Sequence, residues 1–154
     1  MRRFRKDHQL TVYDGSAPHY GLVRAAVEKT KPDVLIFDYF QHIAASETKE
    51  LEGFVRDIKD LAKSANIAVL MCAQLHDGRP DPRTGKVAKP SMIDMKSCKA
   101  LNDESRVVLL LDWARDKEQT DGPVAVSANI AKNKGSCGET LICLERNVPR
   151  FKEA

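Results

Sequence analysis

The sequence predicts an α/β fold in which helices flank a mainly parallel sheet. Two short apolar runs, Val34–Phe37 and residues 67–72, are too brief for buried helices, and an amphipathic helical pattern separates them. A polar residue follows each run, Asp38 after the first and Gln74 after the second. With 154 residues and 42% hydrophobic content, the chain can bury one core, so we expect a single domain over residues 1–154.

The first elements come from local signals. Residues 10–13 are a short strand candidate that precedes an Asp-Gly turn. Ser16 and Pro18 suit the beginning of a helix, and Lys31-Pro32 suits its end. The apolar residues of this helix that share a face are Leu22, Val23, Ala26 and Val27.

The strongest helical pattern lies between the two apolar runs. Its apolar residues repeat every three or four positions, whereas acidic and basic residues occupy the other face. These apolar residues are Leu51, Phe54, Val55, Ile58, Leu61, Ala62 and Ala65. A strand, a helix and a second strand in this order predict parallel pairing. Because the run Val34–Phe37 is continuously apolar, we expect this strand to be covered on both faces.

The second half of the chain has a different character. Residues 76–90, rich in Pro and Gly and without apolar periodicity, are predicted to form a mobile loop. Residues 106–111 predict a third strand. Residues 124–130 and 139–144 alternate in hydrophobicity, which predicts an antiparallel pair, and residues 148–151 could add an edge strand.

Composition limits the possible partners and the possible cellular location of the protein. The net charge of +3 is compatible with nucleic-acid binding without requiring it. No apolar segment is long enough for a signal peptide or a membrane anchor, so we expect a cytoplasmic protein without a membrane partner. The four cysteines and four histidines lack the spacing of a metal site or a catalytic triad.

Several motifs resemble the C-terminal ATPase domain of DnaB-type replicative helicases of bacteria and phages, which has a RecA-like fold. The family has a Walker B segment of the form I-V-I-D-Y-L-Q, and residues 35–41 read L-I-F-D-Y-F-Q. A later family strand ends in S-Q-L, where this chain has A-Q-L at residues 73–75. Residues 93–106 are a looser counterpart of a third family segment, and A-K-N-K-G at residues 131–135 resembles the family hairpin A-K-x-R-x-G.

The resemblance implies ATP and Mg²⁺ as cofactors. Asp38 would hold Mg²⁺ through water, and Gln74 would sense the γ-phosphate and couple it to DNA-binding loops. A turn aspartate and a strand-end glutamine with a backbone contact are the alternatives. Lys132 and Lys134 would reach the nucleotide of a neighbouring subunit, although Lys134 replaces the family's arginine and lacks its planar fork. The alternative interpretation for both lysines is that they lie in a solvated turn without a functional role.

Single-stranded DNA is the implied partner, contacted within the central channel of a hexamer. The candidate residues are basic, lie before and within the looser family segment, and would contact the phosphate backbone. A merely solvated loop is the alternative for each. They are Arg79, Arg83, Lys86, Lys96 and Lys99.

The sequence contains no G-x-x-x-x-G-K-[ST] phosphate loop, and by resemblance the catalytic glutamate is absent as well. We therefore expect negligible ATP hydrolysis by this polypeptide alone. The phosphate-loop strand lies centrally in the RecA-like sheet, so we expect a gap that is closed by re-pairing or by self-association. Three interpretations stay open: part of a helicase that needs the upstream half, a non-hydrolysing DNA-binding or regulatory module, and another RecA-like lineage such as a recombinase.

Overall fold

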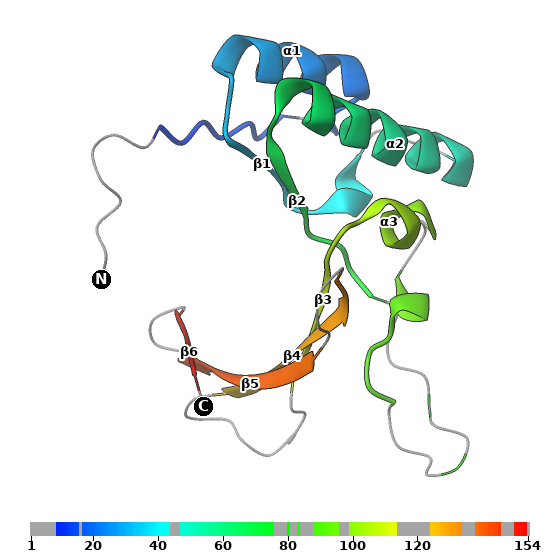
Figure 1. Ribbon diagram of the computed structural model, residues 1–154, viewed down its shortest axis with the longest axis vertical. Coiled ribbons are helices and arrows are strands. Elements are labelled where there is room, and N and C mark those ends of the chain that lie inside the picture. Colours follow the sequence, from blue (N-terminus) through cyan, green and yellow to red (C-terminus); the bar gives the residue numbers. More distant parts are fainter. Residues whose placement is uncertain are drawn as a thin grey trace.

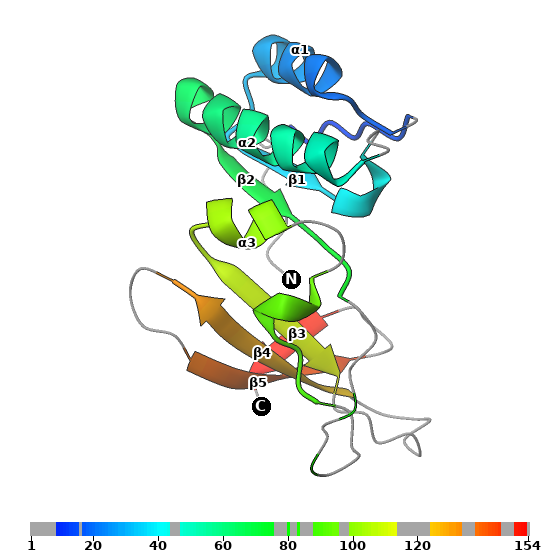
Figure 2. The ribbon, with the colours of Figure 1, turned by 90° about the vertical axis from the view of Figure 1, so that its right-hand side faces the viewer.

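The computed structural model describes residues 9–15, 17–43, 47–75, 80, 83, 88–95, 99–113, 124–133, 138–145 and 150–153. Helices α1 and α2 lie against a parallel pair of strands, β1 and β2, at one end of the molecule (Figure 1). A curved antiparallel sheet of β3, β4, β5 and β6 forms the other end. The short helix α3 lies between the two, as both Figure 1 and Figure 2 show. The α/β class predicted from the sequence is confirmed.

Helix α1 (Tyr20–Thr30) begins slightly later than Ser16 and Pro18 predict. The Nδ1 atom of His19 accepts a hydrogen bond from the Leu22 amide at 3.4 Å and caps the first turn. The predicted end is confirmed, because Lys31 adopts a left-handed conformation (φ 45°) and donates its amide to the Val27 carbonyl at 2.8 Å. Val23 and Val27 are buried as predicted, whereas Ala26 is exposed.

Helix α2 (Thr48–Ala65) confirms the amphipathic pattern. Glu47 and Glu50 form a reciprocal capping box at its start, and Asn66 ends it in a left-handed conformation (φ 53°). The buried face consists of Phe54, Val55, Ile58 and Leu61.

Strands β1 (Val34–Phe37) and β2 (Ala68–Met71) are parallel neighbours, with Phe37 opposite Met71. This confirms the predicted strand–helix–strand unit. The prediction that β1 is covered on both faces is wrong. Side chains on one face are more than half exposed, because no described element packs over them: Val34 53%, Ile36 56% and Leu70 54%.

The core lies between the helices and the other face of this pair. Phe40 is fully buried and Ile58 is 1% exposed, and the Phe37 ring meets the Phe54 ring edge to face at 5.8 Å. Helix α3 (Lys99–Glu104) adds Ala100 and Leu101 to the same cluster. Each fully buried large side chain contributes roughly 1.5–3 kcal/mol. The core thus joins α1, α2 and α3 to the carboxyl end of β1.

The antiparallel sheet contains β3 (Val108–Trp113), β4 (Val124–Lys132), β5 (Gly138–Glu145) and β6 (Arg150–Glu153), in that spatial order. It confirms the predicted hairpin and the edge strand at the tail. In β3 the side chains of Val108 and Leu110 are buried. Leu109 and Leu111 point to the opposite face and are 55% and 44% exposed.

Strands β2 and β3 belong to separate sheets, so the expected closure of the gap by re-pairing within the chain is wrong for the described residues. Helix α3 lies between them and packs its apolar residues into the core around α2 (Figure 2). One edge of β2 and one edge of β3 consequently have no strand partner in the described parts of the chain.

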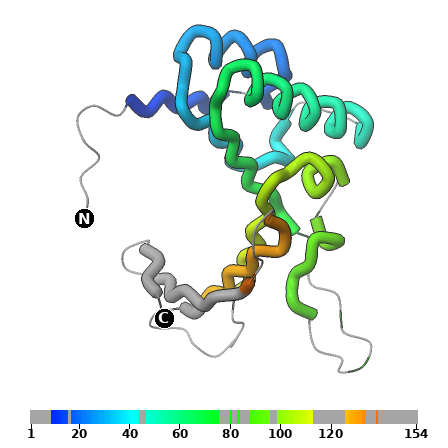
Figure 3. The backbone as a smooth tube through the Cα atoms, viewed as in Figure 1, coloured from blue at the N-terminus to red at the C-terminus, as the bar shows by residue number. Residues whose placement is uncertain are grey.

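The predicted strand at residues 10–13 is also wrong. This segment forms no strand, and its apolar side chains are exposed: Leu10 84%, Val12 74% and Tyr13 63%. A strand needs a hydrogen-bonded neighbour, and no described segment supplies one. In Figure 3 the segment, coloured dark blue, runs from the N-terminal side of the molecule towards α1.

Candidate functional site

Asp38 and Gln74 lie at the same end of the β1–β2 pair, the end at which both strands terminate; this end is called the carboxyl edge below. Asp38 follows the last residue of β1, and Gln74 comes shortly after the end of β2. The two strands are parallel and pair in register up to Phe37 and Met71, so their carboxyl ends meet. Both residues are exposed. The predicted placement at one edge is confirmed, and this is the edge where open α/β sheets bind ligands.

The loop after β1 is fixed to the segment after β2 by main-chain hydrogen bonds. The Cys72 amide donates to the Phe37 carbonyl at 3.0 Å, and the Phe40 amide donates to the Cys72 carbonyl at 2.7 Å. Phe40 also begins a short 3-10 helix, η1 (Phe40–His42), and its ring is fully buried. The peptide bond between Asp38 and Tyr39 is cis. Cys72 itself is exposed.

The side chain of Gln41 holds the main chain of Gln74. Its Oε1 atom accepts a hydrogen bond from the Gln74 amide at 3.2 Å, and its Nε2 atom donates to the Gln74 carbonyl at 3.1 Å. Gln41 is the last residue of the motif that resembles the Walker B segment, and the resemblance assigned it no role. No periodic pattern could have revealed a contact between a side chain and a main chain 33 residues apart.

The segment that follows Gln74 returns to the same edge. Leu75 forms an isolated antiparallel bridge with Met95, directly after the 3-10 helix η2 (Met92–Asp94). The Asp94 carboxylate accepts hydrogen bonds from the amide and the hydroxyl of Ser91, at 2.8 and 2.6 Å. Both ends of the segment between Leu75 and Met95 are therefore anchored beside Gln74.

Asp38 could hold a magnesium ion only if phosphates and water supplied most of its ligands. In the described part of the chain, no group of three or more His, Cys, Asp or Glu side chains gathers in the manner of a complete metal site. Magnesium bound with phosphates needs only one or two carboxylates and keeps several waters. The single exposed carboxylate of Asp38 is suited to such a site.

Lys132 contacts its own chain. Its ammonium group donates hydrogen bonds to the main-chain carbonyls of Asn102 and, at 3.2 Å, Asp103, at the end of α3. A cation near the carboxyl end of a helix is favourable because the last carbonyls have no partner within the helix. Lys134, the other predicted hairpin lysine, lies outside the described residues.

Helix α3 is also tied to α2 by ionic contacts. The Lys59 ammonium donates to the Glu104 carboxylate, and the Arg56 guanidinium lies 4.0 Å from the same group. The hydrogen bond from Lys59 lowers the pKa of Glu104, and the positive charges of Lys59 and Arg56 act in the same direction. These contacts, together with Lys132, fix both the side and the end of α3.

The predicted DNA-binding residues are only partly described. Lys99 is the first residue of α3 and is exposed, and Arg83 is exposed. Arg79, Lys86 and Lys96 lie outside the described residues. The structure therefore places only Arg83 and Lys99 of the five.

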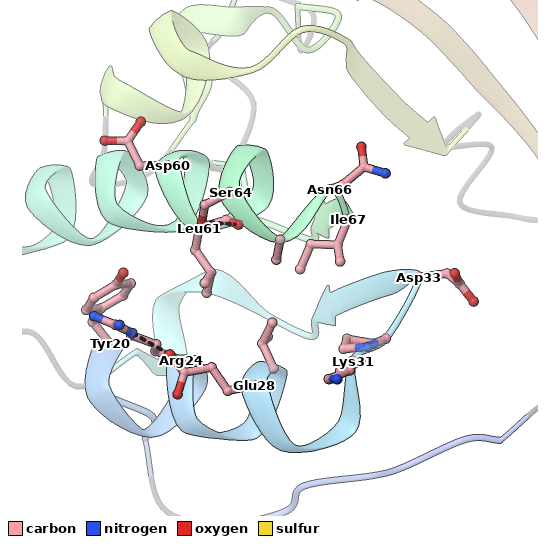
Figure 4. A pocket seen from close by; sticks show the side chains of 13 residues that line it. Tyr20, Arg24, Glu28, Lys31, Asp33, Asp60, Leu61, Ser64, Asn66 and Ile67 are labelled. Carbon is pink, nitrogen blue, oxygen red and sulfur yellow. Dashed lines mark hydrogen bonds and ion pairs between the residues drawn. The ribbon is translucent and has the colours of Figure 1, made fainter.

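A groove of about 850 Å³ between α1 and α2 lies at the other edge of the pair (Figure 4). Val27 and Leu61 form part of its apolar wall, and Lys31 and Asp33 lie where α1 leads into β1. Arg24 and Glu28 form an ion pair at 2.8 Å beside it. Because the groove adjoins the amino end of β1, it is separate from the edge that carries Asp38 and Gln74.

Comparison with known proteins identifies the family of this chain. The family model described as the DnaB-like helicase C terminal domain matches residues 6–153. A replicative DNA helicase DnaB from Mycobacterium intracellulare is 27% identical over 97% of the chain, and one from Leifsonia xyli subsp. xyli is 29% identical over 84%. The chain covers only 28% and 30% of the lengths of these relatives. No helix in the described ranges is long and apolar enough to span a membrane.

Proposed function

The chain belongs to the family of DnaB-like helicase C-terminal domains, and we propose that it supplies the downstream part of an ATPase core that drives DNA unwinding in a hexameric ring. The observation that carries the proposal is the position of Asp38 and Gln74 at the carboxyl edge of two paired parallel strands. Nucleotide-hydrolysing sites need a carboxylate for magnesium and a polar group near the terminal phosphate, and this edge offers both.

In this proposal Asp38 holds Mg²⁺ through water, and Gln74 responds to the γ-phosphate. The bound Mg²⁺ would neutralise charge that develops on the phosphates. Lys132 and Lys134 would act on the nucleotide of a neighbouring subunit. Lys132 would first have to leave the carbonyls of Asn102 and Asp103, to which it donates in the isolated chain.

The chain would act only together with a polypeptide that carries a phosphate loop. Backbone amides and the lysine of such a loop provide most of the fixed positive field for a triphosphate, and this sequence lacks the motif. Within the described ranges, one edge of β2 and one edge of β3 have no strand partner, and the apolar side chains of Ile36, Leu70 and Leu109 are exposed. Both observations support a structural neighbour that these strands would pack against. Bare apolar strand edges favour pairing with another segment.

The test is complementation. The chain is mixed with a separately produced segment that carries the phosphate-loop half of a DnaB-type ATPase domain, and ATP hydrolysis is measured with and without single-stranded DNA. We expect DNA-stimulated turnover from the mixture and negligible turnover from either part. Asp38→Asn, which keeps the size but removes the charge, should abolish it. Mg²⁺-dependent turnover from the chain alone that Asp38→Ala abolishes would refute the proposal of inactivity.

A second candidate function is a DNA-binding module that does not hydrolyse ATP. It is favoured by the exposure of two basic residues, Arg83 and Lys99, which precede and follow Met95 in the sequence. Such a module would bind single-stranded DNA without nucleotide, and the affinity would fall steeply with salt. Salt-dependent binding combined with failed complementation would favour this function over the first.

A further inference from the structure

Gln41 makes a two-bond contact that resembles one rung of a β-ladder. Its carboxamide accepts from the Gln74 amide at 3.2 Å and donates to the Gln74 carbonyl at 3.1 Å. Only one orientation of the carboxamide satisfies both bonds, since its oxygen cannot donate and its nitrogen cannot accept. Gln41 thus replaces a neighbouring strand at the point where β2 has ended.

The base of this contact is rigid. Phe40, the preceding residue, is fully buried and donates its amide to the Cys72 carbonyl at 2.7 Å. The Ile43 amide donates to the Phe40 carbonyl at 3.2 Å, which closes η1 around Gln41. Gln41 is itself only partly exposed. The position of its side chain is therefore determined by the core and not by the solvent-facing loop alone.

Gln74 is also the last residue before the anchored segment. Leu75, its neighbour, bridges to Met95, so the main chain of Gln74 is held between the Gln41 contact and this bridge. Asp38 lies three residues before Gln41 on the same loop. Gln41 consequently connects the loop of Asp38 to the start of the segment between Leu75 and Met95.

We propose that Gln41 is a positioning residue: it holds the main chain of Gln74 so that the Gln74 side chain is free to face the nucleotide. It thereby couples the Asp38 loop to the bridge between Leu75 and Met95 that follows Gln74. This role rests on the proposed ATPase function, because it assigns Gln41 to the same site. The hydrogen bonds between Gln41 and Gln74 use only the main chain of Gln74, which leaves that side chain available.

The contact is tested first in the chain itself, by hydrogen exchange of assigned amides in NMR spectra. Gln41→Ala should make the Gln74 amide exchange about tenfold faster, the effect of losing one hydrogen bond. The Ile58 amide should remain protected, which controls for unfolding. Gln9→Ala, a change at an exposed glutamine, should leave both amides unaffected. Unchanged exchange at Gln74 in Gln41→Ala would overturn the contact.

Gln41→Glu separates the two hydrogen bonds of the contact, because its ability to donate depends on pH. A protonated carboxyl group offers one donor and one acceptor, like the carboxamide, whereas the ionised group offers only acceptors. Either form of the carboxyl group accepts from the Gln74 amide, so the variant should keep this amide protected, whereas the bond to the Gln74 carbonyl should be lost above about pH 4.3, the ordinary pKa of Glu. An exchange profile of Gln41→Glu that matches Gln41→Ala at every pH would overturn the proposed geometry.

The coupling is tested in the mixture with the phosphate-loop half. Gln41→Ala should reduce the stimulation of ATP hydrolysis by DNA about tenfold, while the KM for ATP stays unchanged. Gln41→Glu should restore part of the stimulation as the pH falls. Full stimulation in Gln41→Ala would overturn the coupling alone. No turnover from the wild-type mixture would overturn the proposed function together with the coupling, whereas the exchange data would still decide the contact.

Discussion

The ammonium group of Lys132 donates a hydrogen bond to the main-chain carbonyl of Asp103 at 3.2 Å, and thereby joins strand β4 to the end of helix α3. It donates to the Asn102 carbonyl as well. The antiparallel sheet is thus connected to α3, the helix whose apolar residues belong to the core formed by α1, α2 and the β1–β2 pair. The residue predicted to act on a neighbouring nucleotide has a structural contact within its own chain.

Replacing Lys132 should therefore lower stability. Lys132→Met keeps most of the aliphatic length but removes the donor, and we expect a loss of about 1 kcal/mol in the free energy of unfolding. Lys132→Arg should retain most of the stability because it keeps the charge and the donors. Urea denaturation measures both. Equal midpoints for Lys132→Met and the wild type would show that this contact is not stabilising.

Glu104 should make stability depend on pH in the acid range. Its pKa is lowered in the folded chain, mainly by the hydrogen bond from Lys59, so the unfolded chain binds the proton more readily. The stabilising contribution is present above the unfolded pKa, about 4.3, and is lost as the pH falls through the lower folded value. Glu104→Gln should lose less stability than the wild type over that acid range, measured by denaturation at a series of pH values.

Ile58 and Ile93 form a matched pair that distinguishes the core from the surface. Ile58 is 1% exposed within the α2 core, whereas Ile93 is 77% exposed in η2. Ile58→Ala should cost about 2–5 kcal/mol because it leaves a cavity. Ile93→Ala should change stability by less than about 0.5 kcal/mol. Similar losses in both variants would contradict the packing described for α2.

The exposed face of the β1–β2 pair should drive self-association when no partner is present. Ile36 and Leu70 are both more than half exposed on this face. Sedimentation velocity at increasing concentration should show association of the wild-type chain, and Leu70→Lys should shift it towards monomer with little loss of stability. Monomeric behaviour of the wild type at every concentration would exclude this face as a self-association surface.

Individual helices and strands were predictable from the sequence, whereas the packing of other elements over the strands was not. The pattern of Phe54, Ile58 and Leu61 predicts α2 because helical periodicity is encoded in one segment. The apolar run Val34–Phe37 predicts a strand, but apolarity does not show whether a covering layer is present. Residues 10–13 form no strand for a related reason, since strand pairing depends on a distant neighbour.

The candidate site was predictable to the same extent. Parallel strands place their carboxyl ends together, so Asp38 and Gln74 could be assigned to one edge in advance. The contact of Gln41 with the Gln74 main chain and that of Lys132 with the end of α3 could not, because each joins a side chain to a distant main-chain group. Such contacts depend on tertiary packing and leave no periodic signal.

The central claim is that Asp38 and Gln74 border one magnesium–nucleotide site. Paramagnetic broadening tests it most directly, with Mn²⁺ and a non-hydrolysable ATP analogue added to a mixture of the isotopically labelled chain and the phosphate-loop half. We predict strong broadening of the Asp38 and Gln74 amide signals, little effect at Lys31 and Asp33 on the opposite edge, and loss of the broadening in Asp38→Asn. Broadening centred on Lys31 and Asp33, or broadening at Asp38 and Gln74 that persists in Asp38→Asn, would contradict the claim.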